Sequence, residues 1–145
     1  MRRRALLQLA LVAIAAACTE PTTPVDPVWG KQPCGSCGMI VGDRRYAAQT
    51  LAPNGQRVYF DDLGCMVKYI ADRKIAPARM WVHEAHGDRW LDARAARYAR
   101  GPRTPMDFGF EARADEGISY DAFSAEILQK SAQPKARRAG EKGGP

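Results

Sequence analysis

A tight turn between two short apolar segments sets the first constraint on the fold. Arg45–Leu51 and Arg57–Phe60 are rich in residues that favour strands, and Pro53-Asn54-Gly55 lies between them. An Asn-Gly pair accepts the positive φ angles that hairpin turns need. The sequence therefore predicts an antiparallel β-hairpin over residues 45–60.

An amphipathic helix is predicted directly after the hairpin. Asp61 and Asp62 can cap its N-terminus, and apolar residues at helical spacing follow over Leu63–Arg73. Farther along, the patterns predict a strand at 78–85, an extended piece at 89–91, a short helix at 92–98, a strand at 106–112 and a helix at 120–129. Together these elements indicate an α+β fold in which helices pack on a small antiparallel sheet.

The N-terminus has the pattern of an export signal. Three arginines at positions 2–4 precede the apolar run Ala5–Ala17, which is too short to cross a bilayer but has the length of a secretory signal. Small residues lead into Cys18, as in a bacterial lipobox, in which the cysteine is lipidated. We therefore expect residues 1–17 to be a lipoprotein signal peptide and Cys18 to carry the lipid. An ordinary cleaved signal with a free Cys18 is the alternative, the choice between general and twin-arginine export is open, and every route leads outside the cytoplasmic membrane.

The remaining chain divides into a tether, a domain and a tail. Residues 18–27 are rich in proline and threonine and predict a flexible tether, 28–130 carry the periodicity of a folded domain, and 131–145 are predicted to be disordered. The chain has 22 Lys and Arg against 16 Asp and Glu, a net charge of +6, but the excess lies near the two ends. A neutral body lacks the basic face that nucleic-acid binding requires, so we expect no nucleic-acid partner.

Cys34, Cys37 and Met39 form the segment with the most chemical information, and glycines at 35 and 38 separate them. Glycines let a loop curl so that neighbouring sulfur atoms converge. Thiolate and thioether donors favour Cu(I), and a site with two or three ligands can hand its ion on. A zinc site would need a second pair of ligands, which the sequence does not offer at a suitable spacing. A thiol–disulfide oxidoreductase would place Cys-x-x-Cys at the start of a helix, and the sequence predicts no helix at this segment.

A series of short motifs extends in a fixed order over roughly residues 15–128. They are Cys18, Cys37-Gly38-Met39, Ala48-Gln49, Phe60-Asp61-Asp62, Cys65-Met66, Val82-His83, Trp90-Leu91-Asp92-Ala93, Ala96, Tyr98 and Thr104-Pro105-Met106. In this order they resemble the motifs of NosL, the copper-chaperone lipoproteins associated with maturation of nitrous oxide reductase. The resemblance implies a ββα-type α+β unit related to organomercurial lyase, a Cu(I) cargo and a lipid anchor on the periplasmic side of a bacterial membrane. It also implies nitrous oxide reductase, or its maturation machinery, as the partner that receives copper.

The same resemblance implies a set of ligands. The cysteine and methionine of Cys-Gly-Met correspond to Cys37 and Met39, and the methionine of Thr-Pro-Met corresponds to Met106. Beside these three, Cys34 and His83 are candidate auxiliary donors, although His83 is interpreted foremost as a structural histidine. The chain departs from the simplest family pattern directly after Thr-Pro-Met, where Asp-Phe-Gly-Phe follows in place of small residues.

The roles of the other cysteines stay open at this point. Cys34 could be a ligand, a sulfur that passes the ion on, or half of a disulfide, and pairing with Cys65 would leave Cys37 free. Cys65 is interpreted foremost as a small buried residue of its helix, as is Met66. Because no Ser/His/Asp or paired-carboxylate arrangement has usable spacing, the main hypothesis is a Cu(I) metallochaperone and not an enzyme. The alternatives are a thiol–disulfide oxidoreductase using Cys34 and Cys37, and a zinc-binding or structural surface lipoprotein.

Overall fold

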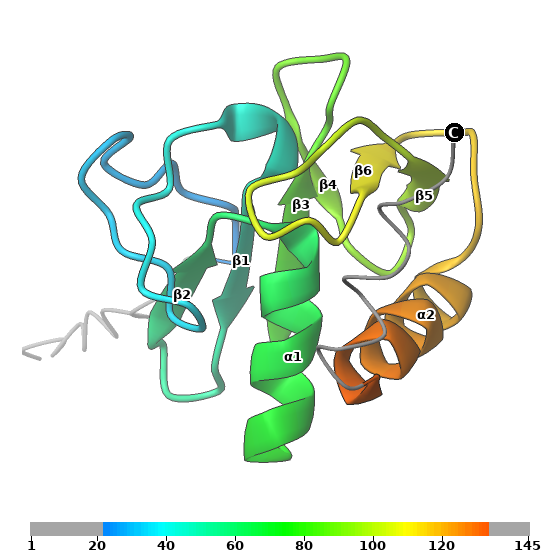
Figure 1. Cartoon of the computed structure of the whole chain (residues 1–145). Helices are drawn as coiled ribbons and strands as arrows, with labels where there is room; N and C mark the ends of the chain where they lie inside the picture. The colour runs from blue at the N-terminus through cyan, green and yellow to red at the C-terminus, as the bar shows by residue number, and fades with distance from the viewer. Residues whose placement is uncertain (1–21, 134–145) are drawn as a thin grey trace, which may run out of the picture.

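The computed structural model describes residues 22–133, which contain two α-helices and six strands (Figure 1). In chain order the elements are the 3₁₀ helix η1 (Arg44–Tyr46), β1 (Ala48–Leu51), β2 (Arg57–Phe60), α1 (Leu63–Arg73), β3 (Arg79–His83), β4 (Trp90–Asp92), β5 (Arg97–Arg100), β6 (Phe110–Arg113) and α2 (Tyr120–Ala132). The predicted signal peptide, Cys18 and most of the predicted tail lie outside the described residues. Within the described range, no helix has the length and apolar character needed to span a bilayer.

The strands form two antiparallel sheets. One has the order β2-β1-β3-β4 and the other pairs β5 with β6. In the predicted hairpin, Ala48 lies opposite Phe60 and Leu51 lies opposite Arg57. Its turn contains Gly55 at φ 84°, as the Asn-Gly signal requires. The expected α+β class with a small antiparallel sheet is confirmed.

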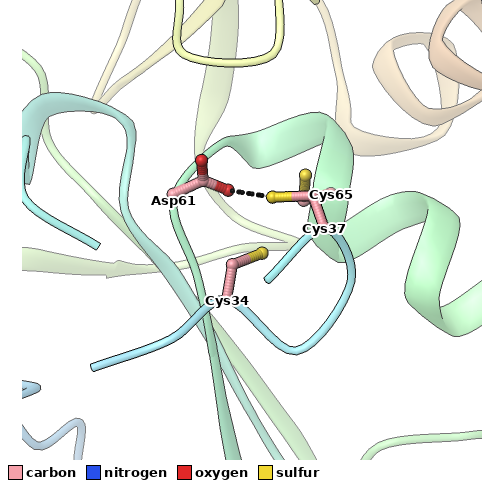
Figure 2. Close-up of side chains that lie close together, drawn as sticks. All are labelled: Cys34, Cys37, Asp61 and Cys65. Carbon is pink, nitrogen blue, oxygen red and sulfur yellow. Dashed lines mark hydrogen bonds between the residues drawn. The ribbon is translucent and has the colours of Figure 1, made fainter. Parts of the chain in front are cut away.

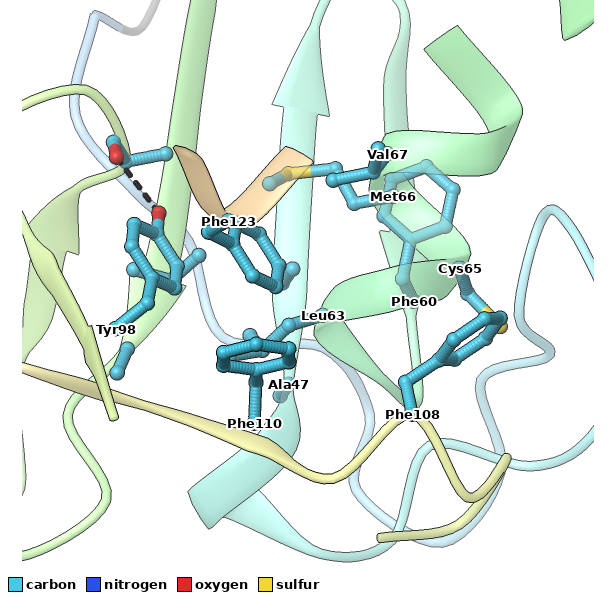
Figure 3. Close-up of a cluster of buried hydrophobic side chains, with 14 of the residues drawn as sticks. Ala47, Phe60, Leu63, Cys65, Met66, Val67, Tyr98, Phe108, Phe110 and Phe123 are labelled. Carbon is cyan, nitrogen blue, oxygen red and sulfur yellow. Dashed lines mark hydrogen bonds between the residues drawn. The ribbon is translucent and has the colours of Figure 1, made fainter. Parts of the chain in front are cut away.

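Helix α1 lies over β1 and β2, and α2 packs beside α1 and β5 (Figure 1). The Asp62 carboxylate caps α1 by accepting a hydrogen bond from the Gly64 N–H at 3.0 Å. The core lies between these helices and the two sheets (Figure 3). Its largest fully buried apolar side chains are Tyr98, Phe60, Phe123, Leu63, Met66 and Ile127. Met66 is therefore a core residue, as predicted.

Three elements differ from the sequence-based expectation. Residues 44–46 form a 3₁₀ turn before β1 instead of extending the strand. The short helix predicted at 92–98 is wrong: Asp92 caps only a turn, accepting from the N–H groups of Arg94 and Ala95, and β5 follows. Tyr98 is buried there, and its hydroxyl donates to the Ala93 carbonyl at 2.6 Å. The strand predicted at 106–112 begins only at residue 110, because residues 104–109 form a loop.

The N-terminal segment lies against the face of the sheet that α1 does not cover. The Val25 backbone exchanges two hydrogen bonds, each 3.1 Å long, with the Gln49 side chain on β1. Asp26 accepts a hydrogen bond from the Trp90 indole on β4 at 2.8 Å. Residues 22–27, which were expected to belong to the flexible tether, are mostly exposed, and Val25 and Asp26 contact the sheet through these hydrogen bonds. The division into tether and domain stays a prediction.

Candidate metal centre

A closed loop holds the first two cysteines, and we call residues 33–40 the cysteine loop. Pro33 and Ile40 form a β-bridge at its base, and the Cys34 N–H donates to the Met39 carbonyl at 2.7 Å. The Gly38 N–H donates back to the Cys34 carbonyl at 3.0 Å, with Gly38 at φ 77°. A side chain at this φ would be strained, so glycine allows the loop to close.

The cysteine loop is fixed to β2 through a second glycine. The Gly35 N–H donates to the Tyr59 carbonyl at 2.8 Å. A Cβ at position 35 would lie only 2.2 Å from Cγ1 of Val58, so no larger residue fits without displacing the loop. This close approach brings the loop to the end of β2, where Asp61 follows Phe60.

Three segments that are distant in the sequence bring four donor groups together. The cysteine loop supplies Cys34 and Cys37, the link after β2 supplies Asp61, and the first turn of α1 supplies Cys65 (Figure 2). One ligand atom from each residue lies within 4.8 Å of all the others. We call these four residues the thiol cluster. Its composition, three sulfur donors and one carboxylate, is suited to a metal ion.

The thiol cluster is buried on one side and accessible on the other. Cys34, Asp61 and Cys65 are exposed by only 4%, 2% and 2%, whereas Cys37 is half-buried. The Cys37 Sγ donates to Asp61 Oδ1 at 3.2 Å (Figure 2). The other oxygen, Oδ2, is buried and has no hydrogen-bond partner among the described residues. An ion that enters would therefore meet Cys37 first.

The surroundings shift the pKa values of these groups in opposite directions. Burial raises the pKa of the Asp61 carboxyl to about 6, with the neighbouring Cys34 adding to the effect. A hydrogen bond from Cys65 holds the pKa of the Cys34 thiol well below its usual range. The same contact raises the pKa of Cys65, and burial raises that of Cys37. In the metal-free protein at neutral pH, Cys34 is therefore the thiol that carries negative charge, and the Asp61 carboxylate is ionised beside it.

All three described cysteines are free thiols. The Cys34–Cys65 disulfide considered above is therefore not formed, although the two residues belong to the same cluster. Cys65 is buried, as the interpretation as a core residue predicts, but its sulfur also joins the donor set. Cys65 can therefore pack in the core and also offer its sulfur to a metal ion.

The two predicted methionine ligands are exposed near the same end of α1. Met39 and Met106 have 48% and 38% of their surface exposed, so both thioethers are accessible to solvent. Met39 follows Cys37 by two residues. The loop that carries Met106, residues 104–109, is attached to Asp62: Oδ2 of Asp62 accepts from the Thr104 hydroxyl at 2.6 Å and from the Met106 N–H at 2.9 Å. Ligation by these methionines stays a prediction.

His83 is placed elsewhere in the fold. It is buried at the end of β3, and its ring lies edge-on to those of Trp29 and Trp90 at 6.2 and 5.2 Å. Its Nε2 is 3.6 Å from Oδ1 of Asp88. The structure does not bring His83 into the thiol cluster, so its auxiliary donor role has no geometric support here.

Comparisons with known proteins bear on the fold of the chain. No protein-family model matches the chain, and no curated protein matches its sequence. Among solved structures, the chain is similar to the copper chaperone NosL from Shewanella denitrificans, with a TM-score of 0.57 and 14% sequence identity. The match covers 75% of this chain and 89% of that chain. The two proteins share a fold. At this level of identity the likeness concerns the fold alone.

Sequence reasoning missed two members of the cluster, Asp61 and Cys65. Asp61 was interpreted as a helix cap and Cys65 as core. A signal was present: one aspartate is sufficient to cap a helix, so the pair Asp61-Asp62 leaves one carboxylate for another role. What the sequence lacked was the docking of the cysteine loop onto β2, which depends on tertiary contacts at Gly35.

Proposed function

We propose that this protein is a Cu(I) metallochaperone that acts outside the cytoplasmic membrane. It binds copper through its thiols and delivers it to a copper-receiving protein, with nitrous oxide reductase as the expected client. A lipid on Cys18 anchors it to the periplasmic side of a bacterial membrane. The client and the anchor rest on the sequence resemblance, whereas the binding of a metal rests on the thiol cluster.

The convergence of three free thiols within 4.8 Å carries the proposal. Soft sulfur donors in this number hold Cu(I) tightly, because soft ligands favour soft ions. The fold shared with a copper chaperone supports the same conclusion. Cys34 and Cys37 lie in a loop and not at the start of a helix, which is the position typical of a disulfide-exchange dithiol, and Cys34, whose thiol pKa is lowered, is buried.

Transfer of the ion requires an accessible face, which Cys37 and the two methionines provide. We propose that Cu(I) is bound by Cys37, Met39 and Met106, with Cys34 and Cys65 behind Cys37 as further sulfur donors. A ligand atom of the copper-receiving protein first displaces one of the two exposed methionines from the ion. Cys37 then releases the ion by ligand exchange, and no covalent chemistry on the protein is needed.

A Cu(I) titration of the full chain tests the proposal. The chain is fully reduced under anaerobic conditions and titrated against a competing Cu(I) chelator. We expect tight stoichiometric binding, which Cys37→Ala abolishes and Ser36→Ala leaves intact, because Ser36 lies in the same loop but its hydroxyl is a hard donor that does not suit Cu(I). Undiminished affinity in Cys37→Ala would overturn the proposal, and a reversible Cys34–Cys37 disulfide without copper binding would favour the oxidoreductase.

The methionines are tested separately with a matched neighbour. Met39→Ala and Met106→Ala are expected to weaken Cu(I) binding less than Cys37→Ala and to speed its release to a chelator. Ile40→Ala is the control, because Ile40 is also exposed (51%) and adjoins Met39 but has no donor atom. Equal release rates in Met39→Ala and Ile40→Ala would remove Met39 from the ligand set.

A further inference from the structure

The thiol cluster contains a donor that a Cu(I) site does not need. Cu(I) favours thiolates and thioethers at low coordination number, whereas a carboxylate oxygen is a hard donor that suits divalent ions. Asp61 is nevertheless turned toward the three cysteines and is buried, as Cys34 and Cys65 are (Figure 2). We propose that Cys34, Cys37, Cys65 and Asp61 form a four-coordinate site for a divalent ion of the zinc type, in which Asp61 is the fourth ligand. In the Cu(I) form Asp61 is not a ligand.

The distances within the cluster suit such a site. Metal–sulfur bonds to zinc are about 2.3 Å long, so neighbouring ligand atoms of a tetrahedral site are separated by about 3.7 Å. The four donor atoms already lie within 4.8 Å of one another, and a contraction of about 1 Å would close the tetrahedron. Cys37 is only half-buried and can move inward by side-chain rotation.

The hydrogen bonding of Asp61 leaves one position for an ion. Oδ1 accepts from the Cys37 thiol, but the buried Oδ2 has no partner among the described residues. A buried acceptor without a partner costs free energy, typically about 1–3 kcal/mol, unless a ligand satisfies it. A bound divalent ion provides that partner and also displaces the thiol proton that Oδ1 accepts.

The charge balance also favours a cation. None of the ion pairs formed by the described residues includes Asp61, so no Lys, Arg or His compensates its charge there. Three thiolates and a carboxylate brought together without a counter-charge would be strongly unfavourable in a buried site. A divalent ion offsets more of this charge than Cu(I) does. For this reason we expect Asp61 to bind the divalent ion and not Cu(I).

This site shares Cys37 with the proposed copper site, so the two ions exclude each other. The sequence alone argued against zinc because a fourth ligand was missing, and the fold supplies it through Asp61 and Cys65. The inference does not depend on copper delivery: zinc binding by the cluster is tested with zinc alone, and copper binding with the titration described above.

A pair of variants tests the inference. The full chain, reduced with a phosphine under anaerobic conditions, is titrated with Zn(II) against a competing chromophoric chelator. Because even outer-shell partners contribute about 10–100-fold to metal affinity, we expect Asp61→Asn to weaken Zn(II) binding by about 100-fold or more. The Cu(I) affinity of the same variant is expected to change far less than its Zn(II) affinity, because Asp61 contacts the Cys37 thiol but is not a Cu(I) ligand. Asp72→Asn is the control, because Asp72 is an exposed carboxylate on α1 that pairs with Lys68.

Two outcomes would overturn the inference. Unchanged Zn(II) affinity in Asp61→Asn would show that the carboxylate is not a ligand, and an equal loss of Zn(II) and Cu(I) affinity would show that it only supports the thiols. If Asp61→Asn does not fold by circular dichroism, Co(II) binding to the wild type decides. Tetrahedral Co(II) bands together with thiolate charge-transfer bands are expected, and their absence would reject the site. Failure of zinc binding with intact Cu(I) binding leaves the metallochaperone proposal standing.

Discussion

At the scale of single residues, Asp61 links the stability of the metal-free protein to pH. Burial raises the pKa of its carboxyl from the ordinary 3.8 to about 6, so the folded state binds this proton more tightly than the unfolded state. The contribution of Asp61 to stability therefore falls as pH rises from 3.8 to about 6 and is lost above that. We expect Asp61→Asn to stabilise the metal-free protein at neutral pH by on the order of 2 kcal/mol.

Urea unfolding of both proteins at acidic and neutral pH measures this effect. The difference between variant and wild type isolates Asp61 from the other carboxylates, several of which titrate in the opposite sense. Asp43 is one example, since its hydrogen bonds with Arg45 lower its pKa. A difference in the free energy of unfolding that does not change with pH would contradict the prediction.

The residues around Asp61 also show how far a sequence can reveal a site. Cys34, Cys37 and Met39 were found from their spacing, because a six-residue loop brings its own side chains together. Cys65 and Asp61 join them only through the docking of that loop onto β2. Contacts between segments that are distant in sequence leave no local pattern, so the sequence predicted half of the thiol cluster.

At the scale of elements, the loop that carries Met106 is held to the N-terminus of α1 by buried polar contacts. The Thr104 hydroxyl donates to Asp62 and accepts from the Gly109 N–H. Thr104→Val removes both bonds and leaves the buried Asp62 carboxylate with fewer donors, which costs about 1–3 kcal/mol. We expect lower stability and also a faster release of Cu(I), similar to that of Met106→Ala, because the loop is no longer positioned.

Thr50→Val provides the matched comparison. Thr50 is buried in β1, away from the loop, and the same exchange of hydroxyl for methyl there tests the general cost of the substitution. Copper release from Thr50→Val should match the wild type. If Thr104→Val is destabilised but releases Cu(I) at the wild-type rate, the loop has no part in holding the ion.

The same loop explains where the prediction of elements failed. The hairpin and α1 were predicted closely, because the turn residues, the capping aspartate and the spacing of apolar residues all indicate the same local structure. Residues 106–109 were assigned to a strand, but their conformation is set by Asp62 and by Phe108, whose ring lies against Gly64. A Cβ at Gly64 would come within 2.3 Å of that ring. Such close packing between two elements overrides local strand propensity.

At the scale of the whole molecule, the thiol cluster lies where three segments meet. An ion bound to the cluster joins the cysteine loop, the end of β2 and the first turn of α1. Metal binding to the folded state alone stabilises it by mass action, by about 4 kcal/mol at a free ion concentration 1,000 times Kd. Occupancy of the site is therefore expected to raise the unfolding temperature of the entire domain.

Gly35→Ala tests whether stabilisation by the bound ion depends on the docked cysteine loop. The added Cβ would approach Val58 Cγ1 to 2.2 Å and displace the cysteine loop from β2, whereas Gly42→Ala meets no atom within 4 Å. Thermal unfolding with and without buffered Cu(I) should show a large metal-induced increase for the wild type and Gly42→Ala. The increase should be much smaller for Gly35→Ala, because Cys34 and Cys37 no longer reach Cys65. A full increase in Gly35→Ala would mean that the docked loop is not required and that the ion binds without joining the three segments.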